Sequence, residues 1–155
     1  MSEQETSSVT AGQGGCTICA TLGGLAGERL IWRDGRFAAY AEGERVPGWL
    51  IFTSERHAEG IWALRSDELA SLGPALAQVA GAMREALGAE RVYFLSLGES
   101  AAHYHGLLVP RYGDDLALAG GIGAAIAGRF LDETSVVEGE YERVTGAIRD
   151  AASSA

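Results

Sequence analysis

The pattern of apolar and polar residues along the first half of the chain predicts three β-strands. Apolar and aromatic residues flank the pair Asp34-Gly35, and such a pair between two apolar runs is a strong signal for a tight hairpin turn. We therefore expect strands at about residues 28–34 and 36–42. A Pro-Gly pair then interrupts the pattern, and the run WLIFT after it predicts a third strand at about residues 49–53.

Residues 66–88 follow the helical period instead. Their apolar residues recur at spacings of three and four, which places them on one face of an amphipathic helix. Ser66 is the expected N-cap and Gly88 the expected C-cap, and we expect Pro74 either to kink the helix or to begin its main segment. The expected buried stripe consists of Leu69, Leu72, Leu76, Val79, Ala80, Met83 and Leu87.

Two more strand-like runs follow the helix, at about residues 91–97 and 101–111, and a Gly-Glu-Ser link joins them. Segment 112–130 is rich in small residues and is ambiguous between helix and loop, whereas residues 135–151 have a helical pattern. The order β-β-β-α-β-β with mostly short links indicates an antiparallel sheet that carries a helix on one face. The predicted fold class is therefore α+β: a five-stranded antiparallel sheet, one long helix packed on it and a C-terminal helix.

Length and charge narrow the domain organisation and the partners. A chain of 155 residues suits one domain, which we place at residues 16–150, between a disordered leader at 1–15 and a frayed tail at 151–155. A formal net charge of −9 leaves no broad cationic surface, so we expect no nucleic-acid partner. All 12 basic residues are arginine, which excludes a lysine nucleophile. No apolar run approaches the roughly 20 residues of a membrane span, and the polar start does not resemble a signal peptide, so we expect a cytoplasmic protein without membrane contact.

Cysteine and histidine are rare in this chain, and their positions suggest a metal site. Cys16 and Cys19 have the Cys-x-x-Cys spacing that lets both sulfurs bind one ion, and no strand pattern precedes them as it does in redox motifs. His57 comes just after the third strand, and His103 and His105 belong to the fifth. Zinc commonly binds two thiolates and two imidazoles in a tetrahedron, so the chain holds a sufficient set of donors.

The two histidines of the fifth strand are not expected to bind the same ion. His103 and His105 lie on one face of a strand, with Cα atoms about 6.5–7 Å apart, and one zinc could not easily take both without distorting the strand. One of them is then expected to complete the metal site, and the other to remain free beside it. The alternative is that the cysteines are inert small residues and the histidines are only hydrogen-bonded. Trp49 and Tyr104 are expected to be packing residues.

Several of these features together resemble the histidine triad (HIT) superfamily of nucleotide hydrolases and transferases. The run HYHGLLVPR, which begins at His103, is similar to the family motif His-φ-His-φ-His-φ-φ followed by Pro-Arg, where φ is apolar. CTIC resembles the N-terminal Cys-x-x-Cys of many bacterial members, and PGWLIFTSERH resembles their segment that ends in a histidine. The resemblance covers residues 16–111 and implies a HIT-like fold, often assembled as a homodimer.

The resemblance also implies roles for individual residues. His105, the middle histidine of the motif, corresponds to the nucleophile that attacks the α-phosphate of a small-molecule, nucleotide-type substrate and is transiently nucleotidylated. Ser100 stands where some members carry a serine that stabilises the phosphoryl oxygens. In the zinc-containing branch of the family, the corresponding ligands of about one structural Zn²⁺ per chain are Cys16, Cys19, His57 and His103.

Several positions depart from the family pattern. Leu107 stands where the third histidine should be, and Glu99 replaces the glutamine of a Gly-Gln-Ser phosphate loop. Ala41 replaces a ribose-binding aspartate on the second strand, with Glu42 beside it, and Gly106 replaces a bulkier residue. The residues expected to contact the substrate are Glu42, Ser96, Glu99 and Leu107.

Three functional hypotheses are open at this point. The first is a zinc-stabilised nucleotidyl hydrolase or transferase with His105 as its nucleophile. The second is a HIT-like protein that binds a ligand or partner without nucleotidyl transfer, since Leu107, Ala41 and Glu99 all depart from the family. The third is an enzyme repurposed for another reaction, for example in a biosynthetic pathway.

Overall fold

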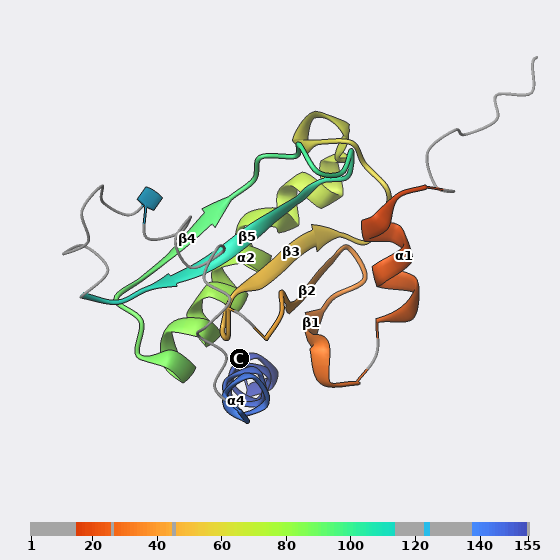
Figure 1. Ribbon diagram of the computed structural model, residues 1–155. Helices are drawn as coiled ribbons and strands as arrows, with labels where there is room; N and C mark the ends of the chain where they lie inside the picture. Colours follow the sequence, from red (N-terminus) through yellow and green to blue (C-terminus); the bar gives the residue numbers. More distant parts are fainter. Residues whose placement is uncertain (1–14, 26, 45, 114–122, 125–137, 155) are drawn as a thin grey trace, which may run out of the picture.

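The computed structural model describes residues 15–25, 27–44, 46–113, 123–124 and 138–154 (Figure 1). These residues form a five-stranded antiparallel sheet with the strand order β1-β2-β3-β5-β4. The strands are β1 (Leu30–Arg33), β2 (Phe37–Ala41), β3 (Leu50–Ser54), β4 (Arg91–Leu95) and β5 (His105–Arg111). The described helices are α1 (Thr17–Gly24), α2 (Ser66–Leu87) and α4 (Glu140–Ser154), with short 3₁₀ turns at Gly27–Arg29 and Ile61–Ala63. The predicted α+β class, the sheet and both predicted helices are confirmed.

The β1–β2 hairpin forms where the Asp-Gly pair predicts it. Asp34 Oδ1 accepts hydrogen bonds from the backbone N–H groups of Arg36 and Phe37 at 2.8 and 2.7 Å. Gly35 has φ +87°, a left-handed conformation that is easiest for glycine. This turn is therefore fixed by the carboxylate of Asp34 and by the lack of a side chain at Gly35.

Helix α2 links β3 to β4, and two bonds define its ends. The Glu68 carboxylate accepts from the backbone N–H of Arg65 at 2.7 Å, so Arg65 and not Ser66 is the N-cap. Gly88 has φ +64° and donates to Arg84 O at 3.0 Å, as expected of a C-cap. Pro74 lies inside this continuous helix. Leu69 is 46% exposed, so the predicted stripe is wrong at that position; the fully buried residues of α2 are Glu68, Ala75, Val79, Ala82 and Met83.

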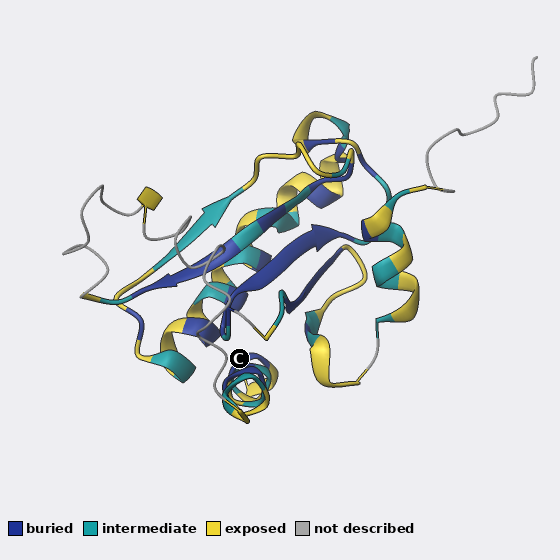
Figure 2. Ribbon diagram, viewed as in Figure 1, coloured by how far each residue is buried: buried dark blue, intermediate teal, exposed yellow. Residues whose placement is uncertain are grey.

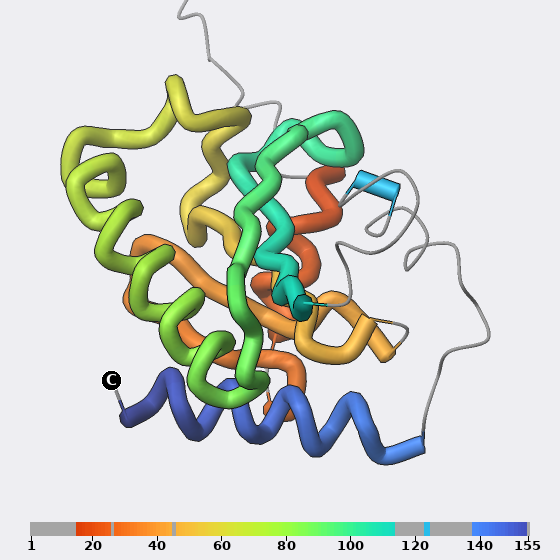
Figure 3. The backbone as a smooth tube through the Cα atoms, turned by 90° about the vertical axis from the view of Figure 1, so that its left-hand side faces the viewer, coloured from red at the N-terminus to blue at the C-terminus, as the bar shows by residue number. Residues whose placement is uncertain are grey.

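The main core lies between one face of the sheet and helices α2 and α4, which pack against each other (Figure 3). Figure 2 shows that the central strands are buried while the outer surfaces of the helices are exposed. The cluster combines Phe37, Leu50, Phe52 and Leu108 from the sheet with Val79, Met83 and Ile148 from the helices.

A smaller apolar cluster covers part of the opposite face of the sheet. Its buried members are Val46, Trp49 and Val109, and Leu107 packs against them. Trp49 and Tyr104 are 2% and 5% exposed, which confirms that both are packing residues. The face that carries this smaller cluster also carries His105, because His105, Leu107 and Val109 alternate along β5.

Three boundaries differ from the sequence-based expectations. No helix is predicted at the Cys-x-x-Cys segment, but the segment opens helix α1. Strand β5 begins at His105 and not at residue 101, so His103 precedes the strand. Helix α4 continues to Ser154 with Ala152 buried, three residues beyond the helical pattern expected at residues 135–151.

Two expected segments lie largely outside the described residues: the leader at 1–15, except for its last residue, and most of segment 112–130. Among the helices that the structure describes, none has the length and apolarity to cross a membrane.

Candidate metal centre and active site

Helix α1 presents both cysteines at its N-terminus. Cys16 is the N-cap, and its Sγ accepts a hydrogen bond from the backbone N–H of Cys19 at 3.5 Å. The local fold thus turns two cysteines three residues apart toward one point.

The four residues expected to bind a metal come together at this point. Their ligand atoms all lie within 4.8 Å of one another. Cys16 Sγ and Cys19 Sγ each lie 3.4 Å from His103 Nδ1, and Cys19 Sγ lies 3.4 Å from His57 Nδ1. The two imidazole rings stand almost perpendicular, with an interplanar angle of 89°. Residues from α1, from the segment after β3 and from the segment before β5 thus form one candidate metal site: Cys16, Cys19, His57 and His103.

The protonation state of His103 suits a metal ligand. His103 is fully buried, and its Nε2–H donates to the backbone oxygen of Ser54 at 2.8 Å. That bond leaves Nδ1, the atom that faces both sulfurs, without a proton. Burial lowers the pKa of His103, which keeps the ring neutral. A hydrogen bond from the far nitrogen of a histidine to a carbonyl is the usual way in which proteins orient a metal-binding imidazole.

The donor set fits zinc. Two thiolates and two neutral imidazoles are a common ligand set for a closed, tetrahedral structural zinc site. Burial, together with the neighbouring Cys16, raises the pKa of the Cys19 thiol, so a pair of thiolates here needs a cation to offset their charge. The site therefore holds the right atoms for one divalent, thiophilic ion.

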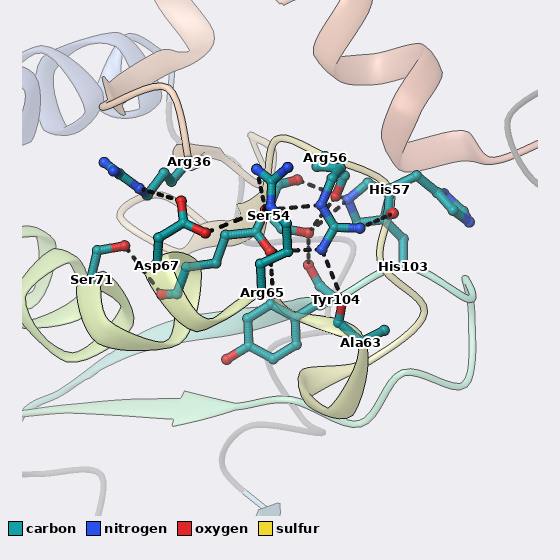
Figure 4. Close-up of polar contacts among 11 residues, drawn as sticks. Arg36, Ser54, Arg56, His57, Ala63, Arg65, Asp67, Ser71, His103 and Tyr104 are labelled. Atoms are coloured by element: carbon teal, nitrogen blue, oxygen red, sulfur yellow. Dashed lines mark hydrogen bonds and ion pairs between the residues drawn. The ribbon is translucent and has the colours of Figure 1, made fainter.

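An arginine clamp holds the segment that carries His57 (Figure 4). Arg56 donates to both carboxylate oxygens of Glu68, at 3.0 and 2.7 Å, and to the backbone oxygens of His57 and Ala63, at 3.1 and 2.8 Å. Glu68 is only 1% exposed, and the hydrogen bond from Arg56 lowers the pKa of its carboxyl group. Sequence reasoning missed this clamp, because a glutamate in the first turn of a helix is expected to face solvent.

His105, the first residue of β5, has a defined orientation of its own. Its Nδ1–H donates to the backbone oxygen of His103 at 2.6 Å. In the neutral ring, Nε2 then carries the free lone pair. The expectation that the two histidines share one face of a strand was wrong, because β5 starts only at His105. The structure nevertheless gives the two residues different surroundings, since only His103 belongs to the metal cluster.

A cavity of about 250 Å³ has His105 in its wall. Ser96 also lines it, and Ser96 Oγ donates to the backbone oxygen of His105 at 2.7 Å. Most of the remaining wall is apolar, and none of its apolar residues was predicted from the sequence to line a site. These residues are Ile61, Trp62, Phe94, Leu97 and Tyr104.

The other residues predicted to contact the substrate or to act in catalysis do not line this cavity. Ser100 is exposed and lines a separate hollow of about 320 Å³ together with Cys16 and His57, and Glu99 is exposed beside it. Ala38 pairs with Thr53, which pairs with His105, so Ala38 marks the level of His105 on β2. Glu42 lies four residues further along the chain, which at the rise of a strand displaces it by about 13 Å along the strand from that level. The structure therefore brings Ser96, but not Ser100 or Glu42, to the cavity beside His105.

Comparison with solved structures identifies the fold. A hypothetical histidine triad nucleotide-binding protein from Sulfolobus tokodaii aligns over 90% of this chain and 93% of its own, with a TM-score of 0.66 and 22% identity. A Zn-bound histidine triad family protein from Mycobacterium smegmatis aligns over 92% and 96%, with a TM-score of 0.66 and 18% identity. A uridylyltransferase aligns over 90% of this chain but only 45% of its own, with a TM-score of 0.60 and 18% identity.

In sequence, no protein-family model and no curated protein matches the chain. The architecture nevertheless agrees with that of the solved structures, one of which is named as Zn-bound. The chain therefore has the histidine triad fold.

Proposed function

We propose that this protein is a zinc-stabilised nucleotidyl hydrolase or transferase in which His105 attacks an α-phosphate. The observation that carries the proposal is the bond from His105 Nδ1–H to His103 O, 2.6 Å long, beside an open cavity. This bond leaves Nε2 as an unprotonated nitrogen in a side chain that is only half buried. The names of the similar structures, a nucleotide-binding protein and a uridylyltransferase, support a nucleotide-type substrate.

The reaction needs little more than a well-placed imidazole. A neutral imidazole is a good nucleophile near pH 7, and a hydrogen bond to its other nitrogen stabilises the positive charge that develops during attack. Attack by Nε2 forms a P–N bond and expels the leaving group. Water or another acceptor then takes the nucleotidyl group from His105. Ser96 holds the backbone of His105 and thereby helps to fix the position of the ring.

The proposed zinc has a structural role. Four protein ligands, Cys16, Cys19, His57 and His103, would fill its coordination sphere and leave no position for substrate. Bound there, the ion would tie α1 to the segment after β3 and to the segment before β5, and neutralise the two thiolates. We expect about one zinc per chain.

Intact-mass spectrometry tests the nucleophile. The protein is incubated with adenosine phosphoramidate, dinucleoside polyphosphates and nucleoside monophosphate esters, quenched in acid-free denaturant, and examined for one added nucleotidyl group. We expect the adduct on the peptide that contains His105, and none in His105→Ala. Ser100→Ala is the matched comparison: the adduct should persist in it, because Ser100 lies in a different hollow. An undiminished adduct in His105→Ala would contradict the proposal.

One observation favours a second function, nucleotide or partner binding without transfer. Leu107 stands at the third position of the motif, and it packs against the cluster of Trp49 and Val109. An aliphatic side chain there can neither donate a proton to a leaving group nor bind a phosphate. Calorimetry that finds tight nucleotide binding without turnover or adduct would favour this second function.

We also propose that the protein forms a homodimer. Within the described residues, β1 and β4 are the outer strands of the sheet, and an uncovered outer strand can pair with a second copy. Light scattering should then give twice the chain mass of 16.2 kDa, and a mass near 16.2 kDa would contradict the dimer. The cytoplasmic location stays a prediction that cell fractionation can test.

A further inference from the structure

The wall of the cavity beside His105 is unusually apolar for a site that handles phosphates. Two of its side chains, Trp62 and Leu97, are 81% and 78% exposed, the two highest values among the exposed large hydrophobic residues of the described chain. Such residues are normally buried, and exposed apolar side chains that gather around a cavity mark a binding surface. Phe94 and Tyr104 continue this apolar wall inward.

The position of Trp62 is set by its neighbour. A side-chain Cβ at Gly60 would overlap the indole ring, so the ring rests directly on the glycine backbone. Gly60 itself has an extended backbone, with φ −172°, which any residue can adopt. A glycine is therefore needed here because the indole ring lies so close, and not because of the backbone conformation. The ring packs with one face against Gly60 at the cavity wall.

The charge around the cavity is the opposite of what an anion needs. Among its described lining residues there is no arginine, and the one carboxylate is that of Glu59, which is exposed. The other polar side chains of the wall are those of Ser96, His103, His105 and Tyr104. A polyphosphate in this cavity would therefore meet a carboxylate and no arginine.

We propose that this cavity binds the leaving group of the substrate, and that this group is an uncharged, apolar and preferably aromatic amine or alcohol residue. The inference rests on the proposed function of His105. Attack of His105 Nε2 on phosphorus forms the P–N bond, and the bond to the leaving group breaks with its electron pair. The leaving group takes a proton from water and departs from the face of Trp62 as the neutral amine or alcohol.

Substrates that differ only in the leaving group test the proposal. Adenosine phosphoramidates of propylamine, phenylpropylamine and carboxyphenylpropylamine have amines of similar basicity, so chemistry alone predicts similar rates. We expect kcat/KM to be at least tenfold higher for the phenylpropyl compound than for the other two, since stacking on an aromatic side chain typically contributes that much. Trp62→Ala and Gly60→Ala should reduce this preference for the phenylpropyl compound. Leu97→Ala should reduce it as well, whereas Leu69→Ala, which removes an exposed leucine outside the cavity, should not.

A binding experiment separates this inference from the proposed function. Saturation-transfer NMR measures binding of phenylpropanol and of its anionic counterpart phenylpropionate to the unmodified protein and to Trp62→Ala. Suppose that the alcohol binds, that Trp62→Ala abolishes this binding, and that no phosphoramidate is turned over. This result would support the apolar binding site and overturn the proposed nucleotidyl transfer. Turnover with equal kcat/KM for all three leaving groups would overturn the cavity assignment and leave the transfer intact. Equal binding of alcohol and carboxylate, or alcohol binding unchanged in Trp62→Ala, would also overturn the cavity assignment.

Discussion

The imidazole of His105 donates its Nδ1–H to the backbone oxygen of His103 across 2.6 Å, and the side chain of His103 belongs to the metal cluster. One residue thus joins the candidate metal centre through its ring to the candidate nucleophile through its backbone. Whatever fixes the ring of His103 also fixes the acceptor that orients His105. A metal without an open coordination position can in this way support a reaction from which it is chemically separate.

The first prediction concerns the tautomer of His105. We expect the neutral ring to carry its proton on Nδ1, because that atom faces a carbonyl oxygen. Long-range ¹H–¹⁵N spectra distinguish the two ring nitrogens, and Nε2 of His105 should give the shift of an unprotonated nitrogen. His105→Ala identifies the signal. A proton on Nε2 in the neutral ring would contradict both the hydrogen bond and the nucleophile assignment.

The second prediction concerns the metal. Freshly purified protein should contain about one zinc per chain by elemental analysis, and a strong chelator should lower its unfolding midpoint. At free zinc 100-fold above its dissociation constant, binding to the folded chain alone stabilises it by about 2.7 kcal/mol. Cys19→Ser should lose the metal and unfold at the temperature of the chelated protein. Thr17→Ser lies in the same helix but provides no donor atom to the cluster, so it should keep the metal and the unfolding midpoint of the parent protein. Stability that does not respond to chelation would count against a structural metal.

The metal cluster could be predicted from the sequence because its members are rare and chemically distinct. Four of the five cysteine and histidine residues converge, and the spacing of Cys16 and Cys19 already places two sulfurs together. Helix α1 was missed because only Ile18 of its residues is buried, so the segment lacks the apolar stripe that indicates a helix. The identity of the ligands thus came from residue types, while the element that presents the cysteines depends on local hydrogen bonds.

The strand boundary was missed for a related reason. Tyr104 O accepts from Ser54 N–H and from Thr53 Oγ1, and Tyr104 N–H donates to Ala58 O. These bonds tie the segment before β5 to the last two residues of β3 and to the segment after it, although the apolar pattern of this segment is that of a strand. Similarly, the expected buried stripe contained Leu69 and not Glu68. A rule based on apolar residues cannot include a carboxylate whose burial depends on its hydrogen bonds from Arg56.

The third prediction concerns the clamp of Arg56 and Glu68. Glu68→Gln removes the charge of a buried carboxylate that accepts two hydrogen bonds from the partly exposed Arg56, and it should lower the free energy of unfolding by about 1–3 kcal/mol at neutral pH. Asp67→Asn changes the neighbouring, exposed carboxylate and should have a much smaller effect. Urea unfolding measures both.

The pH dependence of that difference follows from the direction of the pKa shift. The hydrogen bond from Arg56 holds the pKa of Glu68 below its ordinary value of 4.5 in the folded protein. A carboxyl group with a depressed folded pKa contributes stability above its unfolded pKa, and this contribution is lost as the pH falls through the folded pKa. The difference in the free energy of unfolding between the parent protein and Glu68→Gln should therefore be constant near neutral pH and become smaller in acid. A difference that does not narrow would mean that packing and not charge is what the substitution disturbs.

The last prediction concerns Gly106, where the ring of Phe94 fills the space that a side chain would occupy. A Cβ at this position would lie 2.6 Å from Phe94 Cζ and 2.8 Å from the backbone oxygen of Leu95. Gly106→Ala should therefore lower the free energy of unfolding by about 1–3 kcal/mol, measured by urea denaturation. Gly146→Ala is the matched control with the opposite expectation. Gly146 lies inside α4, where a Cβ would meet nothing within 4 Å beyond the helix's own backbone, so alanine should stabilise the helix by about 0.5–1 kcal/mol.

A second substitution identifies the cause of the strain. Phe94→Leu should relieve part of the cost of Gly106→Ala, because the smaller side chain withdraws from the new methyl group, while the contact with the Leu95 oxygen remains. A double-mutant cycle measures this coupling. If the losses in unfolding free energy of the two single variants simply add, contact with Phe94 is not the reason why a glycine is needed at position 106. If they couple, then Phe94, which packs edge-on against Phe52 and lines the cavity of His105, fixes the backbone one residue beyond the nucleophile.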